Sequence, residues 1–477
     1  LFRSKGEGRG PVARRFERAR LLKSCPRFNS DEERARAEVL VDATLLDRGI
    51  AKELRALLLH GIGVHHAGIL PRYKQLVESL ALARLVKVVL STETIAAGIN
   101  LPAKRVVFPE LRKFINKEAR LLTSAEFHQM AGRAGRPQFD KEGIAIALAP
   151  EEVVQEIRKE TTQAKKRGQS VDAGLIKKGA YARARATAKA KGDVTWDKDA
   201  HERLVRGEPA ALGSRTRITA GQILAIGLPD LKQAPGSAGG QPVYMDPNIR
   251  TVIDHLLLPE RDKRDAHRQV DLITDNLLAI GVIDEHGQQT AGDVVRELVG
   301  VDGLFVYHVL RERDLEYARA RELCELLVDH DVVQRVLNRD EREKRRAWIL
   351  ARLRELRREN SLVSFEDVEA EYEREFPPVL SEMETIHREF AGKLPHPELH
   401  GGKVQKRIWA AMEEDSLGFM DFVERHQLDR EEGSLFGYLS RVQKVARMIS
   451  EASKMAVFED VANRVRDCLA LVDARVV

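Results

Sequence analysis

Three short runs of β-branched residues, set between helix-like segments, constrain the fold of the first third of the chain more than any other feature. The runs are LVKVVLS (85–91), RVVFPEL (105–111) and GIAIALA (143–149). Each is almost continuously apolar, which is typical of strands buried in a parallel sheet. The segment RYKQLVESLALA (72–83) instead repeats its apolar residues at helical spacing. This alternation predicts an α/β domain with a parallel sheet.

The rest of the chain has few strand signals. Residues 161–192 carry nine Lys or Arg against one Asp and are interpreted as a basic hinge, and KQAPGSAGGQP (232–242) is typical of a flexible connector. The apolar spacing that follows is helical. One stripe consists of Leu435, Leu439, Val442, Ala446 and Ile449. The predicted divisions are an α/β domain at 1–160, a basic linker segment at 161–245 and a helical domain at 246–477.

Composition narrows the class of protein. The 477 residues carry a net charge of +5, with a pI near 8.9, which is weak evidence for a nucleic-acid partner. The three cysteines form no CxxC pair, so neither a zinc site nor a disulfide framework is predicted, and a cytoplasmic setting fits best. No apolar run approaches the ~18 residues that span a bilayer. The first residue is not Met, and we expect the chain to begin inside a longer protein.

The segment TSAEFHQMAGRAGR (123–136) contains a helix start and two arginines. Thr123 followed by Glu126 is a capping-box pattern, which predicts that a helix begins at Thr123. Because glycine is a poor helix former, the helix is expected to end at Gly132 or Gly135.

Arg133 and Arg136 are therefore expected to project from the end of this helix or from the turn after it. A guanidinium is a planar fork of donors that suits phosphate oxygens. Together with Gln129, two such groups can grip a γ-phosphate and the charge that develops on it. The alternative interpretation is a solvated helix end with a glycine cap.

A second polar segment, STETIAAGINLPA (91–103), follows directly on the predicted strand at 85–91. Ligands of open α/β sheets collect at the carboxyl ends of strands. Thr92 supplies a hydroxyl group, Gly98 permits a close approach of the backbone, and Asn100 offers an amide. The alternative interpretation is a polar loop that ends in a proline turn.

These pieces share their order and spacing with one known family. The segments are GIGVHHAGILPRYKQLVE (61–78), VLSTETIAAGINLPAKRVVF (89–108), LRKF (111–114) and EFHQMAGRAGR (126–136). They resemble the second RecA-like lobe of superfamily 2 helicases, specifically the Ski-like DExH branch of RNA helicases related to the exosome-associated ones. The resemblance is strong over about 38–160 and weaker over 194–227, and the C-terminal half resembles a domain of unknown function in a group of bacterial members. It implies an α/β RecA-like second helicase lobe with a parallel sheet, followed by mainly α-helical C-terminal domains.

The resemblance also implies which residues form the sites. In such helicases the QxxGRxGR motif faces ATP across the cleft between two lobes, with its arginines as fingers on the γ-phosphate. The residues implied as catalytic are Gln129, Arg133 and Arg136, and those implied in nucleotide binding are Asn100, Gly132 and Gly135. Thr92 and Gly98 are implied to face the RNA backbone, where contacts position a strand without reading its sequence. No metal role is expected for the histidines of VHHAG (64–68), because no further His or Cys lies at a ligand-like spacing.

The sequence departs from the family's pattern in two places. The first lobe of such a helicase needs a GxxxxGK[ST] loop for phosphates and an acidic pair for Mg²⁺, and the loop occurs nowhere in this chain. IDEHG (283–287) follows the arginine motif at the wrong spacing and is interpreted as a turn. We therefore expect ATP and Mg²⁺ to be held mainly by a first lobe, in cis or in trans, and the chain alone to be inactive. In EEGSLFGYLSRV (431–442), Gly437 stands where relatives have an arginine, and Arg441 is interpreted as part of a solvated helix face.

The resulting hypothesis is the C-terminal part of an ATP-dependent RNA helicase, which supplies arginine fingers and RNA-backbone contacts. Two alternatives stay open: a non-catalytic module that binds RNA or a partner, and a DNA helicase of the related repair branch. The basic segment 161–192 either lies along RNA or is a solvated linker. RNA is thus the expected partner, DNA the alternative, and no membrane is involved.

Overall fold

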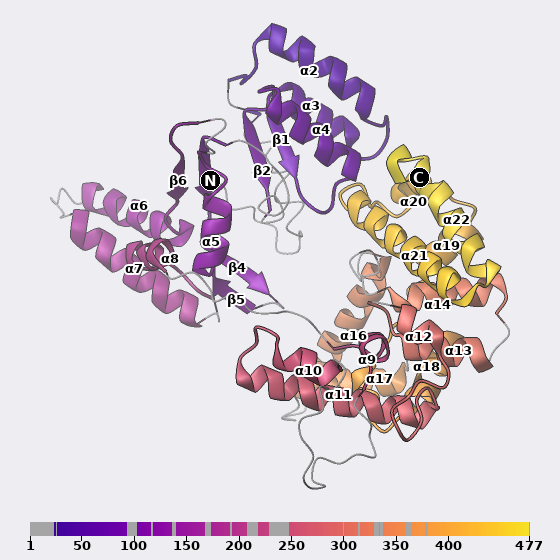
Figure 1. Cartoon of the computed structure of the whole chain (residues 1–477). Coiled ribbons are helices and arrows are strands. Elements are labelled where there is room, and N and C mark those ends of the chain that lie inside the picture. The colour runs from indigo at the N-terminus through magenta and orange to yellow at the C-terminus, as the bar shows by residue number, and fades with distance from the viewer. Residues whose placement is uncertain are drawn as a thin grey trace. The chain divides into compact units, whose positions relative to one another are not determined.

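The computed structural model describes most of the chain, in two compact units (Figure 1). The units are Leu1–Ala211 and Leu212–Val477. The described residues are 23–24, 26–92, 103–115, 118–135, 140–166, 173–190, 193–207, 218–228, 248–298, 300–312, 315–328, 333, 337–358, 364–376 and 380–476.

The first unit begins with two parallel strands and three helices. These are β1 (Ile62–His65), β2 (Val88–Ser91), α2 (Asp31–Thr44), α3 (Ala51–Leu59) and α4 (Pro71–Leu82). The helices α3 and α4 pack against β1, and α2 packs against both helices. Every residue of β1 is buried, and Gly63 lacks room for a side chain because a Cβ there would come within 2.8 Å of Val77. The apolar run at 85–91 thus contains a strand with a parallel partner, as predicted.

The next part of this unit contains the other two predicted strands. It consists of β3 (Arg105–Phe108), β4 (Arg112–Ile115), β5 (Glu118–Leu121), α5 (Ser124–Ala131) and β6 (Ile144–Ala147). The strands β3 and β6 pair in parallel, as predicted, but within the described residues they form a two-stranded sheet separate from β1 and β2 and not one common sheet. The antiparallel β4–β5 hairpin was not predicted, because its residues are mostly polar or charged and show no apolar run.

The burial of β3 and β6 differs from the prediction. Val107 is 50% exposed, and its neighbours across the pair, Ile144 and Ile146, are 39% and 37% exposed. The alternate face does pack, because Val106 and Phe108 contribute to a core beneath α5. The expectation that both strands are buried is therefore wrong within the described part of the chain, where only one face of the pair is covered.

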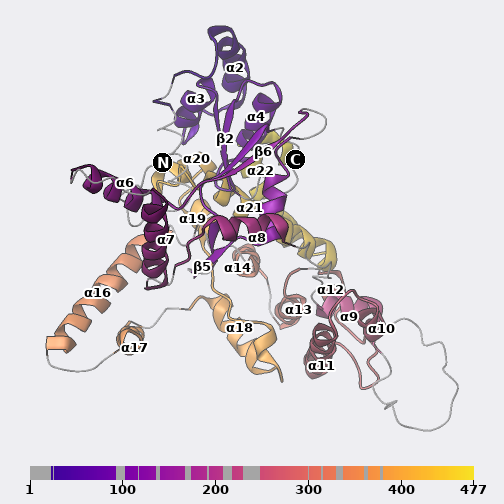
Figure 2. The same ribbon diagram turned by 90° about the vertical axis from the view of Figure 1, so that its left-hand side faces the viewer.

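The basic segment after β6 is helical where the structure describes it. The helices are α6 (Glu151–Lys166), α7 (Ala173–Ala190) and α8 (Lys198–Arg206). Figures 1 and 2 both show α6 and α7 lying side by side, and they pack through a small core that includes Val153 and Ala180. The interpretation of 161–192 as a hinge is therefore wrong for 161–166 and 173–190. Trp196 and Leu204 join the core beneath α5, so this core crosses the predicted division at residue 160.

The second unit is helical, as predicted. Its α-helices are α9 (Ala220–Ile226), α10 (Ile249–Asp254), α11 (Glu260–Ile280), α12 (Asp293–Glu297), α13 (Gly303–Glu312), α14 (Tyr317–Leu327), α16 (Arg339–Arg358), α17 (Phe365–Glu375), α18 (Glu382–Gly392), α19 (Ile408–Glu414), α20 (Phe419–Arg425), α21 (Glu432–Ser453) and α22 (Ala456–Ala470). Two short 3₁₀ helices are η2 (Pro397–Leu399) and η3 (Ala474–Val476). Its described residues contain no strand beyond a single bridge between Ile283 and Gln289. The predicted stripe on α21 is buried, and α21 packs against α22.

The remaining local predictions in this unit concern IDEHG and the start of α21. Residues 283–287 form a turn, in which Asp284 N donates to Gln288 O and Gly287 has a φ of +80°. The turn interpretation is confirmed. Gly437 lies within α21 with open space where a side chain would stand, and Arg441 is exposed on the same helix. None of the described helices has the length and apolarity needed to span a bilayer.

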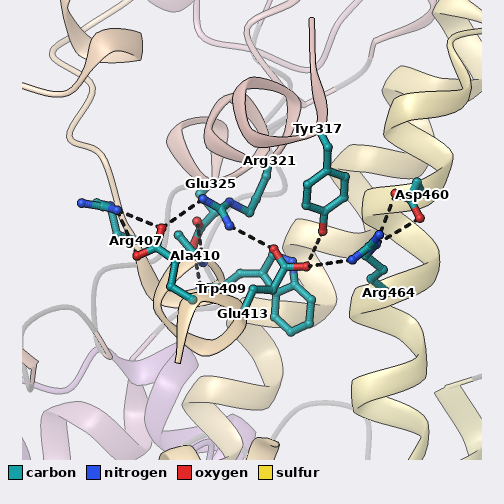
Figure 3. A network of polar contacts seen from close by, with 10 residues as sticks. Tyr317, Arg321, Glu325, Arg407, Trp409, Ala410, Glu413, Asp460 and Arg464 are labelled. Atoms are coloured by element: carbon teal, nitrogen blue, oxygen red, sulfur yellow. Dashed lines mark hydrogen bonds and ion pairs between the residues drawn. The ribbon is translucent and has the colours of Figure 1, made fainter. Parts of the chain in front are cut away.

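A buried polar network joins α14 to α19 and α21 in the second unit, and Figure 3 shows its contacts between α14 and α19. Glu325 of α14 is fully buried and accepts hydrogen bonds from Trp409 N, Ala410 N and Tyr438 Oη at 2.7, 3.2 and 2.7 Å. Arg321, one turn earlier, donates to Glu413 and Glu414 of α19. Burial raises the pKa of Glu325 to about 7, despite the opposing hydrogen bonds. The network fixes α19 between α14 and α21.

Candidate nucleotide and nucleic-acid site

The helix that carries the arginine motif begins where the sequence predicted. Thr123 is its N-cap: the Thr123 Oγ1 accepts a hydrogen bond from Glu126 N at 3.2 Å, and Glu126 Oε2 accepts one from Thr123 N at 2.8 Å. This reciprocal pair is a capping box, which satisfies two of the backbone donors that a helix start leaves open. The sequence prediction of the helix start is confirmed.

Glu126 also joins α5 to the β4–β5 hairpin. Arg120 donates to both of its carboxylate oxygens, at 2.9 and 2.7 Å, and Lys113 Nζ lies 2.5 Å from one of them. The hydrogen bonds from Arg120, followed by those from Lys113 and the Thr123 backbone, lower the pKa of Glu126 to about 2. The carboxylate therefore stays charged at neutral pH and holds the first turn of α5 beside the hairpin.

Two further contacts hold the middle of α5. Phe127 is buried and stacks on Phe108 of β3, with ring centroids 4.8 Å apart. His128 Nε2 lies 3.0 Å from the Val205 carbonyl oxygen at the end of α8. The contacts attach α5 to both β3 and α8. Gln129 is exposed in the following position.

Backbone geometry explains why glycine occupies positions 132 and 135 of the motif. Gly132 caps the helix, its N–H donates to His128 O, and a Cβ would lie 3.0 Å from that oxygen. Gly135 has a φ of +67°, in the left-handed region that favours glycine. A Cβ on Gly135 would come 2.3 Å from the backbone nitrogen of Gly143, just before β6. Arg133 lies half-buried in the turn between the two glycines.

The same turn is attached to the end of the other polar segment. Gly135 N donates to Ala103 O at 2.9 Å, and Ala103 pairs in parallel with Ala134 as an isolated bridge. Ala103 is the last residue of STETIAAGINLPA, so the two motifs meet through the backbone immediately before β3. This contact sets the position of the arginine turn relative to Ala103.

Thr92 marks the other described end of that segment. Its backbone N–H donates to His65 O at 3.3 Å, so Thr92 lies at the carboxyl ends of both β1 and β2. This is the edge of a parallel sheet at which ligands are expected. His65 is itself buried with its Nε2 3.1 Å from Glu78 Oε1, while His66 Nδ1 accepts from Gly68 N at 2.9 Å.

Five of the eight predicted site residues are described by the structure, namely Thr92, Gln129, Gly132, Arg133 and Gly135. Gly98, Asn100 and Arg136 lie outside the described residues. The contacts above bring Gly132, Arg133 and Gly135 together in one turn. Ala103 and Gly143 were missed as positions that fix this turn. The glycine that begins the run GIAIALA was the available signal for the second.

Within the described residues, no group of three or more His, Cys, Asp or Glu side chains is arranged to hold a metal ion. The acidic groups near α5 are engaged by cations, as Glu126 is by Arg120. The motif can contribute the positive charge of Arg133, the side-chain amide of Gln129 and backbone N–H donors. These groups are suited to anionic ligands.

Part of the chain is similar to curated helicases. It is 51% identical over 112 residues to the DExH-box ATP-dependent RNA helicase DExH11 of Arabidopsis thaliana. It is 44% identical over 134 residues to the probable helicase HelY of Mycobacterium tuberculosis and 39% identical over 140 residues to the exosome RNA helicase MTR4 of Homo sapiens. No family model matches the chain.

These matches cover 23%, 27% and 28% of this chain. The chain correspondingly spans only 8%, 15% and 13% of the length of these relatives. The predicted resemblance to DExH-box RNA helicases is confirmed for the matched portion, which is about a quarter of the chain.

Proposed function

From the homology of about a quarter of the chain to DExH-box RNA helicases, we propose that this chain is the C-terminal part of an ATP-dependent RNA helicase. In this proposal Arg133 and Arg136 stabilise the γ-phosphate of ATP, and Gln129 assists them. Asn100, Gly132 and Gly135 line the nucleotide side of the site, while Thr92 and Gly98 contact the RNA backbone.

The observation that carries the proposal is the hydrogen bond between Gly135 N and Ala103 O. It attaches the turn proposed to touch ATP to Ala103, the last residue of the segment proposed to touch RNA. A shift of Ala103 therefore changes the position of the turn. Coupling of this kind is what a helicase needs, because the state of the nucleotide must alter the grip on the strand.

The chemistry proposed for the arginines is electrostatic. Phosphoryl transfer spreads negative charge over the γ-phosphate oxygens, and an arginine finger placed there raises turnover by about 10³–10⁵-fold. Arg133 is held by the turn from both sides, since Gly132 closes α5 and Gly135 contacts Ala103 and Gly143. A guanidinium on so constrained a backbone loses little freedom when it binds an anion.

ATP and Mg²⁺ are proposed to be held mainly by a first lobe, in cis or in trans. The chain's sequence has no GxxxxGK[ST] loop, and its described residues have no acidic cluster for a cation. When bound, Mg²⁺ neutralises the β- and γ-phosphate oxygens. In this proposal the chain places its arginines against the nucleotide and contacts the RNA backbone.

The test compares Arg133→Ala with Arg206→Ala in the full-length protein that contains this chain. Arg206 is an exposed arginine of α8 and carries no assigned role, so it controls for the loss of one positive charge. We expect Arg133→Ala to bind a fluorescent ATP analogue normally and to lower RNA-stimulated ATP turnover by about 10³-fold. Arg206→Ala should retain turnover. Equal turnover in both variants would contradict the finger role.

The two alternatives give different results in the same assay. A non-catalytic module would show no turnover above background in the full-length protein, with or without RNA. A helicase of the DNA-repair branch would be stimulated by single-stranded DNA and not by RNA. Backbone contacts alone carry little base information, so the substrate must be decided by this measurement.

A further inference from the structure

The outer face of α7 carries a row of positive charges that the proposed site does not use. Positions 178, 182, 185 and 189 are separated by four, three and four residues, which places them along one side of a helix. They are Lys178, Ala182, Arg185 and Lys189, and all four are exposed. At 1.5 Å per residue, the row is about 16 Å long.

The other side of α7 accounts for its packing. Ala180 and Ala184 are buried against Val153 of α6, and Tyr181 packs beside them. The exposed row is therefore not needed to attach α7 to α6. It also contains no aromatic side chain, because the only tyrosine of the helix belongs to the packed side.

The cations of α7 differ in how far the protein neutralises them. Arg183, on the flank nearer α6, forms ion pairs with both Glu156 and Glu160. Arg185, in the row, has one partner, Asp197, and is 68% exposed. Lys178 and Lys189 have no ion pair or hydrogen-bonded side chain within the part of the chain that the structure describes. Both ends of the row thus carry positive charge that no described side chain compensates.

We propose that this row is a binding site for the phosphate backbone of single-stranded nucleic acid, separate from the motif residues of the helicase site. Lys178, Arg185 and Lys189 face the phosphates, and the small Ala182 between them lets the strand approach the helix. The inference deepens the proposed function and rests on it, because it adds a second hold on the same strand.

Phosphate is the favoured occupant because of the chemistry of the row. Lysines spaced along a helix offer point charges without fixed geometry, which suits a flexible chain of anions and gives binding that does not depend on sequence. Base stacking requires aromatic side chains, and the row has none. An acidic protein segment is the competing occupant, and the experiment below separates the two.

The test uses the whole chain and the double substitution Lys178→Gln/Lys189→Gln. Binding of a fluorescein-labelled oligouridylate of about 20 nucleotides is measured by anisotropy between about 50 and about 200 mM KCl. The matched control is Lys52→Gln/Lys198→Gln, which removes two exposed lysines elsewhere in the same unit. Far-UV circular dichroism verifies that both variants keep their helix content.

We expect the control to bind as the parent does. The row variant should bind about tenfold more weakly at about 100 mM salt, and the slope of log K against log salt should fall by about 1.4, or about 0.7 per lost phosphate contact. An unchanged slope in a row variant that still binds would overturn the inference and leave the proposed function intact. Failure of the parent chain to bind at any salt would overturn both.

A parallel titration with labelled polyglutamate tests the competing occupant. Under the proposal, polyglutamate binds the parent and the row variant equally weakly at each salt concentration. If polyglutamate binds the parent more tightly than the oligouridylate does, and the row variant loses that binding, the row is a site for acidic protein segments and the inference is wrong.

Discussion

Two of the carboxylates that hold helix starts, Glu126 in the first unit and Glu325 in the second, lie in opposite environments. Glu126 accepts a hydrogen bond from the N-cap nitrogen of α5, and Glu325 accepts two from the first turn of α19. Guanidinium and ammonium groups beside Glu126 lower its pKa to about 2. Burial raises the pKa of Glu325 to about 7.

The difference reflects how each unit uses its charges. Around Glu126, Lys113 and Arg120 remain 22% and 38% exposed, so the cluster keeps contact with water and stays ionised. Around Glu325, the nearby guanidinium of Arg321 is already engaged by Glu413 and Glu414 on α19. In the α/β unit, the charged cluster stays partly exposed to water at the start of α5, the opposite end from the arginine turn. In the helical unit, charged side chains such as Arg321 pair with carboxylates of the neighbouring helix.

The largest effect is expected from Glu325→Ala. The change leaves three buried donors, Trp409 N, Ala410 N and Tyr438 Oη, without their acceptor, and each such loss costs about 1–3 kcal/mol. We expect the unfolding free energy of the helical unit to fall by about 3–5 kcal/mol at pH 8. Urea unfolding followed by Trp409 fluorescence measures it, in a chain whose other tryptophans, Trp196 and Trp348, are replaced by Phe.

The control for that measurement is Glu451→Ala. Glu451 is 66% exposed and pairs only with the exposed Arg447, so its removal should change stability by less than about 0.5 kcal/mol. If Glu325→Ala is no more destabilising than this control, the network of Figure 3 is not what fixes α19.

The second prediction concerns pH and has opposite signs in the two units. In the folded chain Glu325 holds its proton up to about pH 7, whereas in the unfolded chain it ionises near 4.5. The unfolded state therefore binds fewer protons between these values, and stability falls as pH rises through the window, by up to about 3 kcal/mol. For Glu126 the folded pKa is the lower one, so its contribution is present above pH 4.5 and is lost as pH falls toward 2.

The check is the same unfolding experiment from pH 4.5 to 7.5, with Glu325→Gln as the comparison. Gln does not titrate, so the contribution of position 325 to the pH dependence should disappear, while His387, His426 and Glu431 keep their own contributions. If the parent chain shows no fall in stability that Glu325→Gln removes, the carboxyl group is charged in the folded state and the contrast between the two units does not hold.

The sequence predicted contacts between residues close together in the chain, and it did not predict side-chain contacts between distant ones. The capping box at Thr123 is a pattern four residues long, and it was predicted correctly. The Glu325 network joins α14 to residues 84 and 113 positions away, and no local pattern signals it. The segment that forms α7 was interpreted as a hinge from its charge, although it is rich in alanine, the strongest helix former.

The candidate site shows the same limit. The arginine motif and the polar segment after β2 were identified from their residues and the family resemblance, and the end of α5 at Gly132 was predicted correctly. The contacts of Gly135 with Ala103 and Gly143 could not be predicted, because they depend on how β3 and β6 pair. Gly98, Asn100 and Arg136 lie outside the described residues and stay predictions.

The smallest effect is expected from Thr123→Ala, which sharpens the comparison at the α5 end. Glu126 shares the helix start with the Thr123 hydroxyl, so the loss of one partner leaves the other in place. We expect a cost of about 1 kcal/mol in the unfolding free energy of the α/β unit. Thr123→Ser keeps the accepting oxygen and should cost less than about 0.5 kcal/mol.

Fluorescence of Trp196, whose ring packs in the core beneath α5, reports the unfolding in a chain with the other tryptophans replaced by Phe. Equal stability of the Ala and Ser variants would mean that Glu126 alone holds this helix start, as Glu325 does in the other unit.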